Sequence, residues 1–105
     1  MAEISFKGKN FEVDEDGFQL RFGDWCQEWV EYVKEAEGIA EITDDHRKIL
    51  EFLQDYYKKN GIAPMVRILS KNTGYKLKEV YDLFPSGPGK GACKMAGLPK
   101  PTGCV

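Results

Sequence analysis

The last 21 residues differ so sharply in composition from the rest of the chain that they limit where a core can form. Residues 85–105 hold four of the five prolines and five of the eleven glycines, and they contain no acidic side chain. Proline cannot continue a helix, and glycine loses much chain entropy when it is ordered, so we expect this stretch to have little core of its own and to be mobile. The sequence therefore predicts a globular domain over residues 1–84 and a mobile C-terminal arm over residues 85–105.

The length of 105 residues leaves room for one domain with one modest core, and a hydrophobic content of 42% suffices to build it. No stretch approaches the roughly 20 apolar residues of a membrane span, and residues 1–5 lack the features of a signal peptide. A cytoplasmic protein is therefore expected. Thiols are normally reduced there, and an odd number of three cysteines argues against a purely structural disulfide framework.

The charges are distributed unevenly. Residues 1–57 contain fifteen acidic and six basic side chains, a net charge of −9, and residues 58–105 contain two acidic and nine basic ones, a net charge of +7. This asymmetry indicates an acidic or anionic partner for the second half. The alternative is that the two halves complement each other within one fold.

Alternating apolar residues predict β structure over residues 3–21. A loop at residues 7–10 separates the first two strands as a hairpin, and a turn at 14–17 precedes a short third strand near Phe18 and Leu20.

A helix is predicted over residues 24–37, with Asp24 as its N-cap. Its expected apolar stripe comprises Trp25, Trp29, Tyr32, Val33 and Ala36. Cys26 lies one position off this stripe, where a cysteine is more often a small packing residue than a nucleophile.

The clearest helix is expected over residues 43–59. Thr43 begins it, acidic residues follow in its first turn, and Asn60 and Gly61 end it. His46, the only histidine, could act as a general base, but no matched nucleophile stands near it in sequence. A packed or capping histidine is the favoured interpretation.

Two short helices are predicted between residues 64 and 84. The first opens at Pro64, and the second buries Leu77, Val80 and Phe84. Their outline is that of a helix-turn-helix, decorated by Arg67, Lys71, Lys76 and Lys78. A nucleic-acid-binding regulator is therefore an alternative function. Together the elements predict a mostly α (α+β) fold: a small helical bundle with an N-terminal β-hairpin, a helix-turn-helix-like element and a flexible C-terminal arm.

Two of the three cysteines, Cys93 and Cys104, lie in the predicted arm, and Cys104 is next to last in the chain. A thiolate is the reactive form of cysteine and cationic neighbours favour it. Lys90, Lys94 and Lys100 supply such charge near these cysteines. If Cys104 accepts sulfur, Cys93 can attack or bridge it, because a flexible ten-residue spacer lets the two ends meet.

Other interpretations of the cysteine pair are weaker. Zinc needs about four ligands, and one distant histidine with two widely spaced cysteines does not supply them. A static disulfide is disfavoured in a reducing compartment, and two accidental exposed cysteines remain an alternative. The glycines at 87, 89 and 91 lack the spacing of a phosphate-binding loop.

The C-terminal sequence contains the motifs Leu83-Phe84-Pro85-x-Gly87-Pro88, then Cys93, then Ala96-Gly97-Leu98-Pro99-Lys100-Pro101-x-Gly103-Cys104-Val105. These motifs give the chain a close resemblance to the DsrC/TusE family. It extends over essentially the whole chain and includes Asn60-Gly61-x-x-Pro64-x-x-Arg67. Family members are small, mostly helical proteins with an N-terminal hairpin, a helix-turn-helix-like element and a protruding arm.

The resemblance implies a sulfur-carrier protein that is not catalytic alone. It implies that Cys104 bears sulfur and that the arm inserts into dissimilatory sulfite reductase, so that this cysteine comes close to the siroheme. The α and β subunits of that enzyme are the expected partners. Cys93 marks the sulfite-reductase branch, in which both cysteines hold sulfite-derived sulfur as a trisulfide. Lys90, Lys94, Lys100 and Arg67 are the expected partner-binding residues.

Further partners and alternatives follow from the same resemblance. A membrane-bound thiol-disulfide reductase complex would release sulfide and regenerate the thiols. Siroheme and iron–sulfur clusters are expected on the partner and no cofactor or metal in this chain, which lacks a cluster ligand set. The branch that relays persulfide sulfur for transfer RNA thiolation generally keeps only the penultimate cysteine, so it is the less favoured alternative.

Overall fold

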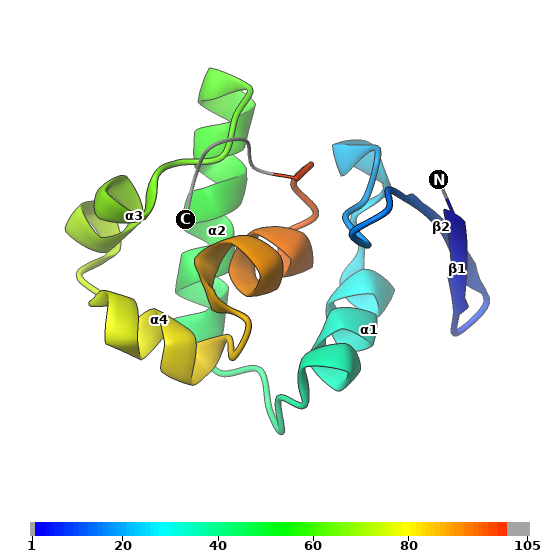
Figure 1. Cartoon of the computed structure of the whole chain (residues 1–105), viewed down its shortest axis with the longest axis horizontal. Helices are drawn as coiled ribbons and strands as arrows, with labels where there is room; N and C mark the ends of the chain where they lie inside the picture. Colours follow the sequence, from blue (N-terminus) through cyan, green and yellow to red (C-terminus); the bar gives the residue numbers. More distant parts are fainter. Residues whose placement is uncertain (1, 101–105) are drawn as a thin grey trace.

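The computed structural model describes residues 2–100 and has one small sheet and a set of short helices (Figure 1). In chain order the elements are β1 (Ala2–Phe6), β2 (Lys9–Val13), η1 (Phe22–Asp24), α1 (Gln27–Glu37), α2 (Asp44–Asn60), α3 (Val66–Thr73), α4 (Leu77–Leu83) and η2 (Pro88–Cys93). The hairpin lies beyond α1 at one edge, and α3 and α4 lie on the other side of α2 (Figure 1). The mostly α fold with an N-terminal hairpin is confirmed.

The hairpin follows the predicted alternation. Its two strands are antiparallel and pair Ile4 with Phe11. Phe11 is buried and its ring packs edge-on against the Trp29 ring, with centroids 5.1 Å apart. The expected third strand is reduced to a single bridge between Val13 and Gln19.

The helix predicted over 24–37 begins later, at Gln27. Asp24 is the last residue of the 3₁₀ turn η1, and Cys26 occupies the N-cap position. The reason lies outside the local sequence: Trp25 is extended (φ −62°, ψ 135°), and its indole N–H donates to the Met95 carbonyl. Ala36 is exposed, so the buried stripe consists of Trp29, Val30 and Val33.

Helix α2 matches its prediction closely. Thr43 is the N-cap, and its hydroxyl accepts from the backbone N–H of His46. Gly61 ends the helix in a left-handed conformation. The helix buries Ile49, Leu50 and Leu53, which form part of the core.

The pair α3–α4 is present, with a turn at Gly74 between the helices. The burial within it differs from the prediction: Val80 and Phe84 are buried, but Leu77 is 45% exposed. Each helix of the pair buries only one of its own residues, Leu69 in α3 and Val80 in α4. A nucleic-acid-binding role for this pair stays a prediction.

The stretch predicted to have little core of its own is instead packed between α1 and α2, where it appears in orange in Figure 1. Its buried residues are Gly87, Pro88, Gly89, Gly91, Ala92, Cys93, Met95, Ala96, Gly97 and Leu98. This corrects the boundary at residue 84, at least through Leu98. The physical reason is that small residues let backbone approach closely: a Cβ added at Gly91 would lie 2.9 Å from the Cβ of Phe84. The mobility of residues 85–105 stays a prediction.

Candidate functional site

The site is organised around Cys93, the last residue of η2. Cys93 is 3% exposed, and its carbonyl accepts a 3.1 Å hydrogen bond from the N–H of Leu98. Cys104, the other predicted sulfur-bearing residue, lies outside the described residues 2–100. The structure therefore defines the surroundings of one of the two predicted cysteines.

Three side chains from distant parts of the sequence donate to consecutive carbonyls just after Cys93. The indole N–H of Trp29 donates to the Lys94 carbonyl at 2.7 Å, and that of Trp25 donates to the Met95 carbonyl at 2.9 Å. The amide Nε2 of Gln54 donates to the Ala96 carbonyl at 3.0 Å. The Lys94 carbonyl also accepts from the Gly97 N–H at 3.1 Å. Carbonyls at the C-terminal end of a helical segment have few partners within it, and the three side-chain donors add hydrogen bonds there.

The other end of the same segment is held by Glu37. Its carboxylate accepts from the backbone N–H of Ser86 at 2.9 Å and from the Ser86 hydroxyl at 2.7 Å. Glu37 and Trp29 lie about two turns apart on α1. Helix α1 therefore binds both ends of the segment that carries Cys93.

The three predicted lysines are brought together around the turn that follows β2. Lys100 Nζ lies 2.5 Å from Asp16 Oδ2, and Lys94 Nζ lies 5.0 Å from the centre of the Phe18 ring. The hydrogen bond and charge of Lys100, with smaller effects of Lys90 and Lys94, lower the pKa of Asp16 below its ordinary value of 3.8. Asp16 likewise raises the pKa of Lys100.

The fourth predicted partner-binding residue, Arg67, lies exposed on α3 and is not part of this lysine group. Because Lys100 is paired with Asp16 and Lys94 lies over Phe18, an acidic partner has to compete with contacts inside the chain. The charge complementarity considered as an alternative from the sequence is thus present at Lys100.

Sequence reasoning missed Gln19, Trp25 and Gln54 as residues of this site. Gln19 is 1% exposed, and within residues 2–100 neither its Oε1 nor its Nε2 has a hydrogen-bond partner. A Cβ added at Gly97 would lie 2.8 Å from Gln19 Oε1 and 2.7 Å from Trp25 Cδ1, so both side chains contact this glycine. The sequence did indicate that Gln54 faces the protein interior, because it lies on the apolar face of α2, four residues after Leu50.

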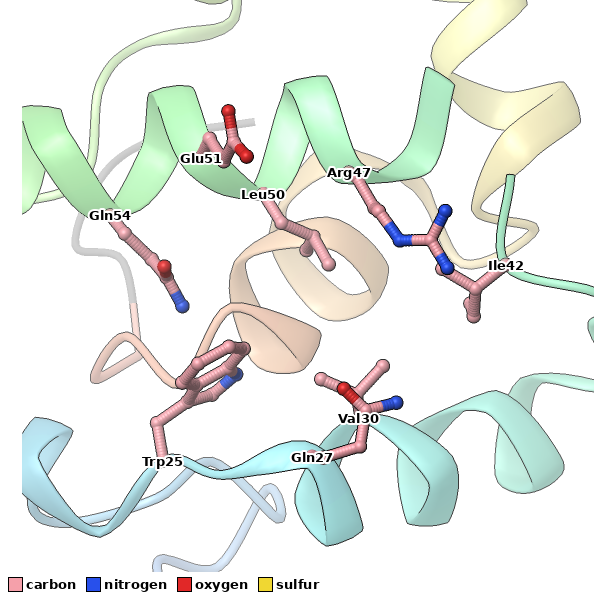
Figure 2. Close-up of a pocket in the computed structure, with 8 residues that line it drawn as sticks. All are labelled: Trp25, Gln27, Val30, Ile42, Arg47, Leu50, Glu51 and Gln54. Carbon is pink, nitrogen blue, oxygen red and sulfur yellow. The ribbon is translucent and has the colours of Figure 1, made fainter. Parts of the chain in front are cut away.

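A pocket of about 170 Å³ lies between α1 and α2, next to these donors (Figure 2). Trp25 and Gln54 line it, so they contact both the pocket and the Cys93 segment. Gln27, Arg47 and Glu51 supply further polar groups, and apolar side chains complete the lining. The pocket is amphipathic and leaves space beside Gln54.

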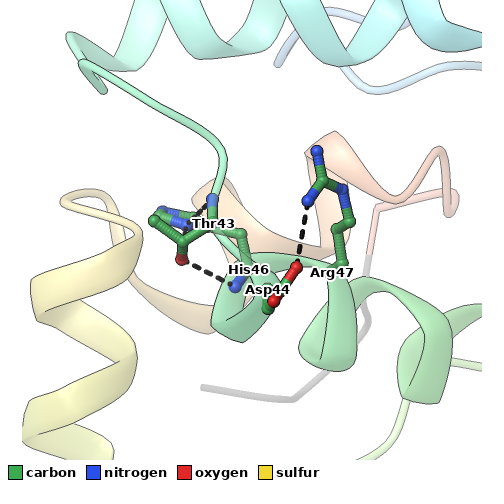
Figure 3. A network of polar contacts seen from close by, with 4 residues as sticks. All are labelled: Thr43, Asp44, His46 and Arg47. Atoms are coloured by element: carbon green, nitrogen blue, oxygen red, sulfur yellow. Dashed lines mark hydrogen bonds and ion pairs between the residues drawn. The ribbon is translucent and has the colours of Figure 1, made fainter.

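The only histidine has a structural role, as predicted. His46 is 4% exposed; its Nδ1 lies 3.0 Å from the Thr43 backbone nitrogen, which donates to it (Figure 3). Its Nε2 lies 2.8 Å from the Leu83 carbonyl, so this nitrogen carries the proton. His46 thereby caps α2 and links it to the end of α4, and both ring nitrogens are occupied.

Among residues 2–100, no group of three or more histidine, cysteine, aspartate or glutamate side chains is arranged to hold a metal ion. None of the helices described in the structure is both long and apolar enough to cross a membrane.

A family model described as DsrC-like protein matches residues 5–105. The chain belongs to the DsrC-like family. The resemblance drawn from the C-terminal motif is confirmed, and the match extends over nearly the whole chain.

Individual relatives agree with this assignment. The dissimilatory-type sulfite reductase subunit gamma of Nitratidesulfovibrio vulgaris (strain Hildenborough) is 84% identical over 105 residues, which cover all of both chains. The sulfurtransferase TusE of Shigella flexneri is 35% identical over 109 residues, covering 97% of this chain and 99% of the relative.

Solved structures give the same result. The crystal structure of dissimilatory sulfite reductase I (DsrI) contains a chain with 73% identity and a TM-score of 0.93, covering 99% of this chain and 100% of that one. The oxidised gamma subunit (DsrC) from Archaeoglobus fulgidus has 42% identity and a TM-score of 0.86, with the same coverage.

Proposed function

We propose that this chain carries sulfite-derived sulfur for dissimilatory sulfite reductase and holds it between Cys93 and Cys104. The observation that carries the proposal is the 84% identity, over the full length of both chains, to a dissimilatory-type sulfite reductase subunit gamma. The placement of Cys93 supports it, because a buried sulfur on a packed segment is protected from unrelated oxidants and thiols.

The positions of the two cysteines favour different roles for them. Cys93 lies on the segment bound by α1 and α2. Cys104 follows the last described residue, Lys100, by four positions, a length of chain that spans at most about 14 Å when extended. In the proposal Cys104 enters the partner and accepts the sulfite-derived sulfur there. Cys93 then forms a bond to that sulfur atom.

The chemistry balances when two partner proteins supply the electrons. Sulfite and two thiols join as a trisulfide when two electrons and four protons are supplied, and three water molecules leave. A further four electrons and four protons release hydrogen sulfide and restore both thiols. In the proposal the siroheme and iron–sulfur clusters of the sulfite reductase α and β subunits supply the first electrons, and a membrane-bound thiol-disulfide reductase complex supplies the second.

The test is turnover of the full chain with purified dissimilatory sulfite reductase, sulfite and a reductant, followed by intact-mass measurement. We expect the chain to gain one sulfur atom and lose two hydrogens. Cys104→Ser and Cys93→Ser should each abolish this product, whereas Cys26→Ser should retain it. An unmodified wild-type chain after turnover would contradict the proposal.

A persulfide relay is the second candidate, and the 35% identity to a sulfurtransferase TusE favours it. A relay needs only one sulfur-bearing cysteine, so Cys93→Ser would still accept and pass on a persulfide. In that case the mass of wild type and of Cys93→Ser would rise by the same single sulfur atom, which separates the relay from the trisulfide proposal.

A further inference from the structure

The segment that carries Cys93 is poorly equipped to hold itself in place. Residues 87–97 contain four glycines and two alanines, which offer little side-chain surface for packing. The backbone hydrogen bonds of Pro88–Cys93 continue only as far as the N–H of Leu98, which donates to the Cys93 carbonyl, and a short helical segment is marginal by itself. Contacts from elsewhere in the chain must therefore fix its position.

Those contacts are concentrated immediately after the cysteine. Trp29, Trp25 and Gln54 donate in turn to the carbonyls of Lys94, Met95 and Ala96. The donors come from α1, from the residue preceding its N-cap, and from α2, so the two helices bind the segment from both sides. Trp29 is fully buried, and Trp25 and Gln54 are half-buried.

We infer that Trp25, Trp29 and Gln54 are positioning residues that hold the sulfur of Cys93 in a fixed place for reaction with Cys104. The inference rests on the proposed two-cysteine function. A thiol that is held in a fixed position has a high effective concentration for reaction with a second thiol on the same chain. A mobile thiol has a lower one. None of the three side chains needs to contact the reacting sulfur to have this effect.

The chain offers a matched pair of variants. Gln54 and Gln27 line the same pocket, but only Gln54 donates to the Cys93 segment. Leucine is close in size to glutamine, and the pocket leaves space on this side of Gln54. Gln54→Leu therefore removes one hydrogen bond with little change in packing, and Gln27→Leu makes the same chemical change without removing it. Trp25→Phe removes a second donor and keeps an aromatic ring.

The first measurement is the equilibrium between the full-length chain and glutathione. One glutathione disulfide oxidises the Cys93 and Cys104 thiols to an intramolecular disulfide, and two reduced glutathione molecules form. We expect Gln54→Leu and Trp25→Phe each to lower this equilibrium constant by about fivefold, the effect of one hydrogen bond. Gln27→Leu should leave it unchanged. A purely structural role predicts lower melting temperatures with an unchanged equilibrium constant, and that result would overturn the inference.

The second measurement does not depend on Cys104. In a Cys26→Ser, Cys104→Ser background, Cys93 is the only thiol, and because it is buried an alkylating reagent reacts with it when the segment opens. Gln54→Leu and Trp25→Phe should speed alkylation by about fivefold, again one hydrogen bond, and Gln27→Leu should not.

The two measurements separate the two ideas. Faster alkylation in Gln54→Leu with no Cys93–Cys104 bond in the wild type supports the positioning of Cys93 and contradicts the proposed function. A stable wild-type bond with all variants alike in both measurements contradicts the positioning and leaves the proposed function standing.

Discussion

The α3–α4 pair and residues 87–98 show opposite relations between composition and burial. The pair has the apolar spacing of core helices, yet each helix buries one residue, and Leu77 and Tyr81 of α4 are 45% and 48% exposed. Residues 87–98 have the glycine content of a linker, yet nearly all of them are buried. Apolar spacing reports which face of a helix can be buried, and tertiary packing decides whether it is.

The glycines of the two regions also have different roles. Gly74 ends α3 in a left-handed conformation and has open space around it. Gly97 has the same φ of 81°, but its backbone lies against Trp25 and Gln19. In the first region glycine provides a turn, and in the second it also allows two surfaces to approach more closely than a side chain would permit.

The largest expected effect is a difference in stability between two leucine variants, one from each region. Leu98 is fully buried, so Leu98→Ala should lower the free energy of unfolding by about 2–5 kcal/mol. Leu77 is 45% exposed, and Leu77→Ala should change it by about 0.5 kcal/mol. Urea denaturation of the two variants checks this. Equal losses would mean that the burial of the C-terminal segment contributes no stability.

A smaller difference is expected between two glycine variants. Gly97→Ala and Gly74→Ala share the strain of a left-handed alanine, about 1–2 kcal/mol. Only Gly97→Ala adds overlap with Trp25 and Gln19, which should cost a further 1–3 kcal/mol, roughly. The difference between their unfolding free energies measures the close approach alone. If the two variants lose the same stability, the segment can move away from Trp25 at no cost.

The smallest effect concerns the ion pair at the end of the segment. Lys100 lowers the pKa of Asp16 below 3.8, so the pair stabilises the fold at neutral pH, and this contribution is lost as the pH falls through the lowered pKa. Lys100→Ala should move the pKa of Asp16 upward, toward its ordinary value. An NMR titration of the Asp16 carboxyl carbon measures the shift. An unchanged midpoint would show that Lys100 does not remain at Asp16 in solution.

Much of this fold is determined by local sequence. The strands, α2, its Thr43 cap and its Gly61 end depend on contacts between residues near one another in the chain, and each was predictable for that reason. The structural role of His46 was predictable from its place in the first turn of α2, although its contact with the Leu83 carbonyl was not.

The environment of Cys93 was decided only by the tertiary structure. The sequence shows a reactive residue type among glycines and lysines, and that composition favours a mobile arm. The donors that bind the segment, Trp25, Trp29 and Gln54, come from 42 to 70 residues away. Glycine and alanine make a chain flexible where no other part of the protein packs against them. They allow close packing where a complementary surface does. The local sequence does not show which of these two situations applies.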